Sequence, residues 1–279
     1  MNMLRAALMQ MTAGIDPAAN ALAIEQAMAR AAEAGATLFC TPEMSNLIDR
    51  DRARAASHIV AEGDDEVLRR ICAAAAKHHL WVLIGSLAVR HEGEADKYAN
   101  RSYLIDDTGA IRARYDKMHL FDVDLASGES WRESNAYAAG NTAMVADTPW
   151  GGIGLSICYD IRFPALYQAL SAAGAKILAI PAAFTVPTGR AHWETLLRAR
   201  AIENACFVIA TAQTGLHEDG RETYGHSCVI DPWGEILLSL DEEQGLGIVD
   251  LPLDRIDDIR ARIPVIAHRR PIPTAQVAK

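Results

Sequence analysis

The chain has 279 residues, of which half are hydrophobic and 23% are charged, and its formal net charge is -9. This size and apolar content allow a large buried core and exclude a disordered chain. The acidic balance, without a basic stripe, argues against nucleic-acid binding and against anionic membrane surfaces, because both depend on clustered positive charge.

The first hundred residues alternate between strand-like stretches and stretches with apolar residues at helical spacing. Strands are predicted at residues 3–10, 37–40, 80–89 and 98–106. Helices are predicted at residues 17–34, with Gly35 just past the end as a C-cap, and at 64–78. The strand at 98–106 ends in a hairpin turn signal at residues 107–110.

The segment from about residue 119 to residue 140 has a different character. It is polar, shows little periodicity and is long for a passive connection. Long loops in compact domains are often functional, so we expect this segment to contribute to a site.

The alternation then resumes. Strands are predicted at residues 152–157, 176–180, 206–212, 226–230, 235–240 and 247–250. Helices are predicted at residues 163–173, at 190–204 and from about 253. Hairpins and crossovers together indicate a mixed α/β fold. Since no repeat or linker interrupts the pattern, we predict a single domain over residues 1–279, with a C-terminal arm from about residue 265.

Cysteine usage indicates the compartment. The five cysteines are odd in number and widely spaced, with no CxxC pair, which argues against a disulfide framework and against a zinc ribbon. The first residues are too weakly apolar for a signal peptide, and no apolar run is long enough to span a bilayer. We therefore expect a soluble, cytoplasmic protein.

Cys158 is the candidate nucleophile. It follows the apolar strand at 152–157 and precedes a predicted helix. At such a turn, backbone N–H groups can hold an oxyanion and a helix N-terminus lowers the pKa of a thiol. The alternative is an inert buried thiol. We expect that inert state for Cys72, Cys206 and Cys228.

A thiol nucleophile needs a base, and two kinds are available. His119, His192 and His226 could each serve, although no local pattern marks them. Glu43 ends a short buried strand, where desolvation would raise its pKa and make it a better base near neutrality. A loop carboxylate or a helix cap is the alternative role for Glu43. Lys117, taken alone, is typical of a solvated surface charge.

Several segments resemble the nitrilase superfamily of carbon–nitrogen hydrolases. Three of them, at 39–43, 115–121 and 155–164, resemble its signature segments and occur in the same order at similar spacing. A fourth, at 131–134, resembles the segment that carries a second glutamate. The resemblance extends over nearly the whole chain and includes the later blocks at 191–204 and 224–234.

The resemblance implies a role for each candidate. Glu43 would be the general base, Lys117 an electrophilic stabiliser and Cys158 the nucleophile that forms a thioester. Glu133 would hold Lys117 and help to position the substrate, and the backbone N–H of Tyr159 would complete the oxyanion hole. The resemblance implies a reaction without a metal or an organic cofactor.

The residues that follow Cys158 narrow the choice of substrate class. Cys-Tyr-Asp-Ile-Arg-Phe-Pro at 158–164 resembles the Nit branch of amidases rather than nitrilases, which usually have Cys-Trp-Glu. Residues 184–193 and 213–217 are most similar to deaminated glutathione amidases. This similarity implies a small carboxylated amide as substrate, with release of ammonia. Omega-amidases and N-carbamoyl amino acid amidohydrolases are the alternative subfamilies. Two alternative functions are acyl transfer from the same thioester to an amine and an inactive family member that acts as a binding scaffold.

A carboxylated substrate requires a local cation in an acidic protein. Arg162 is the first candidate because it lies close after the nucleophile, and its alternative role is to pair with Asp160. Arg190 and Arg198 are weaker candidates. Thr185 could shape the pocket, with a loop role as the alternative.

The resemblance also implies the architecture. Its fold is a four-layer α-β-β-α sandwich whose members pair through helices. The helices at 163–173 and 190–204 are the candidates for the face of a homodimer or higher homo-oligomer, and the C-terminal arm is a further candidate contact.

Overall fold

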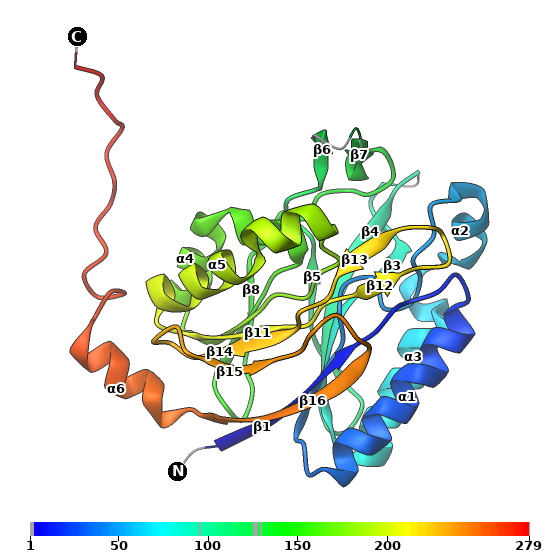
Figure 1. Ribbon diagram of the computed structural model, residues 1–279, viewed down its shortest axis with the longest axis horizontal. Helices are drawn as coiled ribbons and strands as arrows, with labels where there is room; N and C mark the ends of the chain where they lie inside the picture. The colour runs from blue at the N-terminus through cyan, green and yellow to red at the C-terminus, as the bar shows by residue number, and fades with distance from the viewer. Residues whose placement is uncertain (1–2, 95, 125–127, 129, 279) are drawn as a thin grey trace.

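Two six-stranded β-sheets form the centre of the computed structural model, which describes residues 3–94, 96–124, 128 and 130–278 (Figure 1). The first sheet has the order β16 (Gly245–Pro252), β1 (Met3–Gln10), β2 (Leu38–Cys40), β3 (Trp81–Arg90), β4 (Tyr98–Ile105) and β5 (Ile111–Asp116). The second has the order β15 (Ile236–Ser239), β14 (Cys228–Ile230), β11 (Phe207–Ala210), β10 (Ala175–Ala179), β9 (Gly152–Leu155) and β8 (Met144–Ala146).

Helices cover the outer face of each sheet (Figure 1). The first sheet is covered by α1 (Pro17–Glu33) and α3 (Glu66–His78), and the second by α4 (Pro164–Ala172) and α5 (Val186–Asn204). The expected four-layer α-β-β-α sandwich is therefore confirmed.

The alternation of side chains along the strands builds two separate apolar layers. In β2, Leu38 and Cys40 face the second sheet, whereas Phe39 faces the helices α1 and α3. Because both faces of the strand are covered, all three of its residues are buried. This double burial explains why the strands read as continuous apolar runs rather than as alternating patterns.

Strand direction places the carboxyl ends of several strands together. In the first sheet, β1, β2 and β3 are parallel through the crossover helices, and β4 is antiparallel to both β3 and β5. In the second sheet, β9, β10 and β11 are parallel through α4 and α5. Ligands of open α/β sheets bind beyond the carboxyl ends of such strands. Glu43, Lys117 and Cys158 follow three of these ends, those of β2, β5 and β9.

Smaller elements surround the sandwich, and several of them are absent from the sequence predictions. They are α2 (Arg52–His58), the paired strands β6 (Asp122–Asp124) and β7 (Ser130–Arg132), the paired strands β12 (Thr214–Leu216) and β13 (Glu222–Tyr224), α6 (Asp254–Arg262) and the 3-10 turns Glu62–Asp64, Glu133–Asn135 and Cys158–Arg162. The loop predicted at 119–140 contains β6, β7 and one of these turns; its positions 125–127 and 129 lie outside the described residues.

The end of the chain follows α6 and runs away from the body of the sandwich (Figure 1). Arg269 anchors its first part, because its guanidinium donates to the Gln168 carbonyl at 2.9 Å and to Asn204 Oδ1 at 2.7 Å. These acceptors belong to α4 and α5 of the same chain. Among the described residues, none of the helices combines the length and the apolar character needed to cross a bilayer.

Candidate active site

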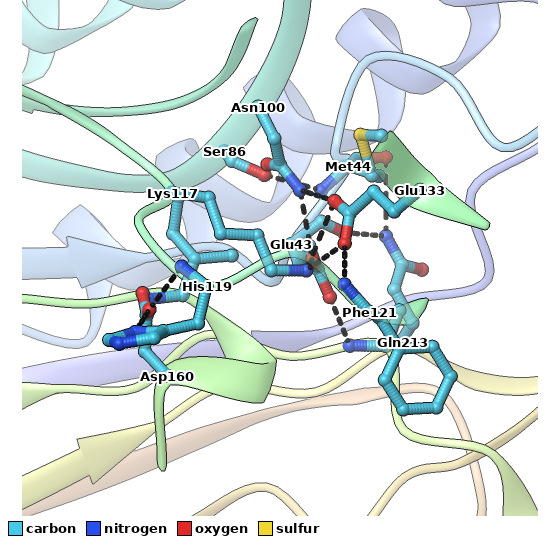
Figure 2. A network of polar contacts seen from close by, with 12 residues as sticks. Glu43, Met44, Ser86, Asn100, Lys117, His119, Phe121, Glu133, Asp160 and Gln213 are labelled. Atoms are coloured by element: carbon cyan, nitrogen blue, oxygen red, sulfur yellow. Dashed lines mark hydrogen bonds and ion pairs between the residues drawn. The ribbon is translucent and has the colours of Figure 1, made fainter. Parts of the chain in front are cut away.

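Glu43 lies just beyond β2 and is buried among donors (Figure 2). Its Oε1 accepts hydrogen bonds from Asn100 Nδ2 and from Lys117 Nζ, each at 2.9 Å. Its Oε2 accepts the backbone N–H of Ala183 at 2.9 Å. The Gln213 amide donates to the Glu43 carbonyl at 2.9 Å and so fixes the backbone. Both carboxylate oxygens are therefore held in defined directions.

Lys117 follows β5 and is almost completely buried between two carboxylates. Its Nζ lies 2.9 Å from Glu43 Oε1 and 2.8 Å from Glu133 Oε2. Burial alone would lower the pKa of this ammonium, but the Glu133 and Glu43 carboxylates outweigh that effect and hold its pKa well above the ordinary value. Lys117 is therefore a fixed positive charge.

Glu133 holds this arrangement from the other side. It begins the 3-10 turn after β7, and its Oε2 accepts the Phe121 N–H at 2.7 Å. Asn100 donates from the same nitrogen to Glu133 Oε1 at 3.1 Å and to Glu43. The contribution of Asn100 is absent from the sequence predictions. The only signal for Asn100 in the sequence is an amide side chain inside a predicted strand.

Cys158 occupies a sharp turn directly after β9. Its φ is 50°, in the left-handed region that residues other than glycine rarely adopt, and its N–H donates to the Pro181 carbonyl at 2.8 Å. At this strained turn the Cys158 thiol is close enough to the Glu43 carboxylate for the two groups to interact. The strand-end position predicted from the sequence is confirmed.

The predicted pKa directions of the two reacting groups are wrong. Burial raises the pKa of the Cys158 thiol well above its ordinary value, and the Glu43 carboxylate raises it further. Burial acts to raise the pKa of Glu43 as well, but the charge of Lys117 and the hydrogen bonds it receives lower that pKa overall. The resting pair is therefore a carboxylate beside a neutral thiol, rather than a thiolate beside a poised acid.

Asp160 ties the nucleophile turn to the lysine segment. Its buried carboxylate accepts the Ile157 N–H at 2.8 Å and the Tyr115 hydroxyl at 2.7 Å. The same carboxylate contacts the His119 backbone N–H at 3.0 Å and its ring at 2.7 Å. These bonds join the residues that flank Cys158 to those that flank Lys117.

The three candidate histidines make other contacts in the described structure. His119 is bound to Asp160 and stacks on Phe163 with ring centres 3.6 Å apart. His192 contacts the Arg162 guanidinium, and His226 contacts the Tyr224 carbonyl. Glu43 is the group that the structure brings to the thiol.

A cavity of about 680 Å³ opens over these groups and is lined by Glu43, Lys117, Glu133 and Cys158. Its volume lies in the range of small-molecule sites. Tyr159, Arg162 and Thr185 also line it, as the sequence analysis anticipated for substrate contacts.

The residues predicted to contact the substrate differ in their surroundings and in whether they line the cavity. The Arg162 guanidinium lies over the rings of Tyr159 and Phe184, 5.9 Å and 5.5 Å from their centres, and it is not among the partners of Asp160 described above. Thr185 is the N-cap residue of α5 but makes no side-chain capping hydrogen bond, and its hydroxyl is hydrogen-bonded to that of Thr188. Two further arginines do not line the cavity: Arg190 is exposed, and Arg198 pairs with Glu194 at 3.3 Å.

Gly85 in β3 allows the two sheets to meet at the site. A Cβ at this position would lie 2.3 Å from the Thr41 carbonyl, 2.4 Å from the Pro42 carbonyl and 2.5 Å from Pro181 Cβ. Thr41 and Pro42 directly precede Glu43, and the Pro181 carbonyl accepts the N–H of Cys158. A glycine in a strand marks such a close approach, but only the structure identifies what approaches.

No metal-binding arrangement is found in the described ranges, since no three His, Cys, Asp or Glu side chains are grouped suitably. The donors to the Glu43 carboxylate are a lysine, a backbone amide and a side-chain amide. This set can hold a developing oxyanion and exchange one proton, which is the chemistry of acyl transfer.

Comparisons with known proteins agree with this chemistry. The model of the carbon–nitrogen hydrolase family matches residues 5–261. The chain is 39% identical to a deaminated glutathione amidase from Yersinia enterocolitica, with 95% of this chain and 92% of the relative covered. It is also 39% identical to the human deaminated glutathione amidase, over 95% of this chain and 82% of that one.

Solved structures give the same picture. The crystal structure of the Caenorhabditis elegans NitFhit protein superposes with a TM-score of 0.89 at 38% identity and covers 96% of this chain, which spans 65% of that longer protein. An amidase from a Nesterenkonia species superposes with a TM-score of 0.78 at 30% identity, over 94% of this chain and 98% of that one. That amidase was captured with acrylamide added to its active-site cysteine.

Proposed function

Since the chain belongs to the carbon–nitrogen hydrolase family and is a hydrolase of carbon–nitrogen bonds other than peptide bonds, we propose that it is an amidase whose nucleophile is Cys158. The observation that carries the proposal is the grouping of Cys158, Glu43 and the buried Lys117 at the wall of one cavity, with Lys117 Nζ 2.9 Å from Glu43 Oε1.

The first step forms the thioester. Glu43 accepts the thiol proton as sulfur attacks the amide carbon, and the carbonyl electrons move to oxygen. Lys117 and the N–H of Tyr159 stabilise this oxyanion; loss of one such donor typically costs on the order of a hundredfold in rate. As the intermediate collapses, Glu43 gives its proton to the leaving nitrogen and the amine departs.

The second step hydrolyses the thioester. Glu43 takes a proton from water, the hydroxyl adds to the thioester carbon, and the same donors hold the oxyanion. Collapse releases the carboxylic acid and returns the proton to the sulfur of Cys158. Glu133 keeps Lys117 in place and charged throughout. Glu43 thus carries every proton in this scheme, from the thiol to the leaving nitrogen and from water back to the sulfur.

The substrate proposed is deaminated glutathione, because relatives named for that activity match nearly the full chain. The leaving group then differs from the ammonia expected in the sequence analysis. Each amide nitrogen of a glutathione derivative carries a carbon substituent, so its hydrolysis releases an amine, and ammonia would come only from primary amides. Omega-amidase and N-carbamoyl amino acid amidohydrolase activities are the alternatives.

A product screen tests this proposal. Deaminated glutathione, 2-oxoglutaramate, N-carbamoyl amino acids and simple nitriles are offered to the enzyme, and both amine and ammonia are measured. We expect the highest kcat/KM for deaminated glutathione. A preference for nitriles would contradict the assignment, and no turnover of any amide would favour a scaffold role.

Two variants test the roles of the residues. Cys158→Ala is expected to abolish turnover and Glu43→Gln to reduce it by at least a hundredfold, both with an unchanged circular dichroism spectrum. Cys72→Ala is the matched control, because Cys72 is a partly buried thiol on α3, away from the cavity. Full activity of the Cys158 variant would refute the mechanism.

We further propose that the protein acts in the cytoplasm as a homodimer. All five cysteines are free, which fits a reducing compartment. Exposed Ile202 on α5 supplies an apolar contact on the helical face expected to pair.

A further inference from the structure

A second group of side chains lines the same cavity and has no role in the chemistry above. The guanidinium carbon of Arg221 lies 4.7 Å from the centre of the Trp131 ring, and that of Arg50 lies 5.2 Å from it. All three residues line the cavity. Two cations therefore meet on one indole, in a protein whose net charge is -9.

The hydrogen bonding of this group is incomplete. Arg221 lies 3.6 Å from Asp219 Oδ2, which is an ion-pair distance but too long for a hydrogen bond. Three atoms here are buried without a hydrogen-bond partner: Arg221 Nε, Trp131 Nε1 and Asp219 Oδ2. Polar atoms left in that state cost stability, so they are usually retained for a purpose.

The charges around Arg221 also favour binding of an anion. Burial lowers the pKa of Arg221, Asp219 opposes that effect, and the charge of Arg50 lowers the pKa further. Arg50 and Arg221 carry like charges, so an anion bound between them would reduce their repulsion. The side chain of Arg221 keeps 20% of its surface exposed, so its guanidinium can still receive a ligand from the cavity.

The backbone fixes this group relative to the catalytic residues. Trp131 lies two positions before Glu133, on β7. Arg221 immediately precedes β13, where the Tyr224 N–H donates to the Phe184 carbonyl at 3.0 Å. Phe184 follows Ala183, whose N–H holds Glu43. Catalytic and cationic groups are therefore parts of one frame.

Aromatic rings separate Arg221 from the other arginine candidate, Arg162. Arg162 lies over Tyr159; Tyr159 meets Phe121 with ring centres 5.1 Å apart; Phe121 meets Trp131 at 6.3 Å. Three rings thus form a row, with Arg162 at the Tyr159 end and both Arg221 and Arg50 at the Trp131 end. Cys158 precedes Tyr159 in the same turn, and both line the cavity.

We propose that Arg221, held on Trp131 and assisted by Arg50, binds a carboxylate on the leaving-amine part of the substrate, while Arg162 binds a carboxylate on the acyl part. The inference rests on the proposed amidase function and specifies its substrate class: an amide with an anionic group on each side of the scissile bond. Arg162 and Arg221 lie at opposite ends of the row of rings, so each would bind the carboxylate at one end of such a substrate.

The test is a binding cycle that does not depend on turnover. In a Cys158→Ala background, calorimetry measures the Kd of deaminated glutathione and of its analogue with the terminal glycine carboxylate converted to a carboxamide. We expect the acid to bind about 10- to 100-fold more tightly than the carboxamide, the range for hydrogen bonds to a charged group. Adding Arg221→Gln should bring that ratio close to one, and Arg221→Lys should give an intermediate ratio.

The controls separate this inference from the proposed function. Arg198→Gln, which removes an exposed arginine outside the cavity, should leave the ratio unchanged. An unchanged ratio in Arg221→Gln, equal binding of both compounds by the parent, or binding of neither overturns the Arg221 assignment. The product screen with the wild-type enzyme judges the amidase function separately, so the two can fail independently.

Discussion

The charge state of the Glu43–Cys158 pair depends on neighbours from other strands. Burial would raise the pKa of either acid, as the sequence analysis expected for Glu43. Lys117 and Asn100 reverse the direction for Glu43, whereas the nearby carboxylate adds to the effect of burial for Cys158. The thiol therefore stays protonated until it reacts, and the base is ionised and ready.

This charge state predicts the pH profile. A group with a lowered pKa in the free enzyme keeps its base form to lower pH, so kcat/KM should stay level on the acid side until the pH falls below about the ordinary glutamate value of 4.5. A histidine base would give a fall near pH ~6.5 instead. Initial rates across pH 4–8, with circular dichroism as the control for unfolding, distinguish the two; a midpoint near 6.5 would contradict the Glu43 assignment.

Asp160 offers a second prediction at the residue scale, since its carboxylate links the two catalytic segments. Asp160→Asn keeps the size but replaces one acceptor oxygen by a donor, which opposes either the Ile157 N–H and Tyr115 hydroxyl at Oδ2 or the His119 N–H at Oδ1. We expect a loss of about 1–3 kcal/mol in the free energy of unfolding by urea. The shift of the turn should also reduce kcat by about 10- to 100-fold.

The control for Asp160 is Asp250→Asn, in an exposed ion pair with Arg5. It should leave both quantities nearly unchanged, because surface pairs contribute little. Wild-type kcat in Asp160→Asn would show that this carboxylate does not position the site.

At the scale of elements, the site depends on how closely β3 approaches its neighbours. Gly85 leaves room for the chain before Glu43 and for Pro181 of the second sheet. The same approach lets the Pro181 carbonyl hold the Cys158 N–H. One strand thus sets the distance between the base from one sheet and the nucleophile from the other.

Gly85→Ala should therefore disrupt the site more than the fold. The added Cβ would meet backbone oxygens at 2.3 Å and 2.4 Å, which requires the Glu43 segment to move. A displacement near 1 Å costs on the order of a hundredfold in kcat. Gly63→Ala is the control, because nothing lies within 4 Å of a Cβ there. Equal activity of the two variants would refute this role.

At the scale of the whole molecule, the face formed by α4 and α5 is the candidate for pairing. Ile202 on α5 is 50% exposed, and Arg269 fixes the base of the C-terminal arm on the same helices. Apolar side chains on an exposed helix face are consistent with an interface between copies.

We expect sedimentation to give about twice the chain mass of 30.2 kDa. Ile202→Glu should shift the protein toward monomer, because burying an unpaired charge at an interface is unfavourable. Leu22→Glu, at a position 49% exposed on α1, is the matched control and should stay dimeric. A monomeric wild type would contradict the proposed dimer.

Local patterns were sufficient for most of the elements, whereas the candidate residues were distinguished mainly by the resemblance of their segments to one family. Apolar runs predicted the main strands of both sheets, and the strand-end positions of Glu43 and Cys158 are properties of neighbouring residues. Short elements such as β8 and β12 were missed, because three residues carry too little periodicity to be distinguished from a loop.

The sequence by itself therefore determined the family, the alternating elements and the identity of Glu43, Lys117, Glu133 and Cys158 as candidates. The tertiary structure alone decided the direction of their pKa shifts, since burial and the partner charges come from different strands. It also decided what Asn100, Asp160 and Gly85 do. Each of these acts through residues distant in sequence, and such contacts exist only once the two sheets have packed.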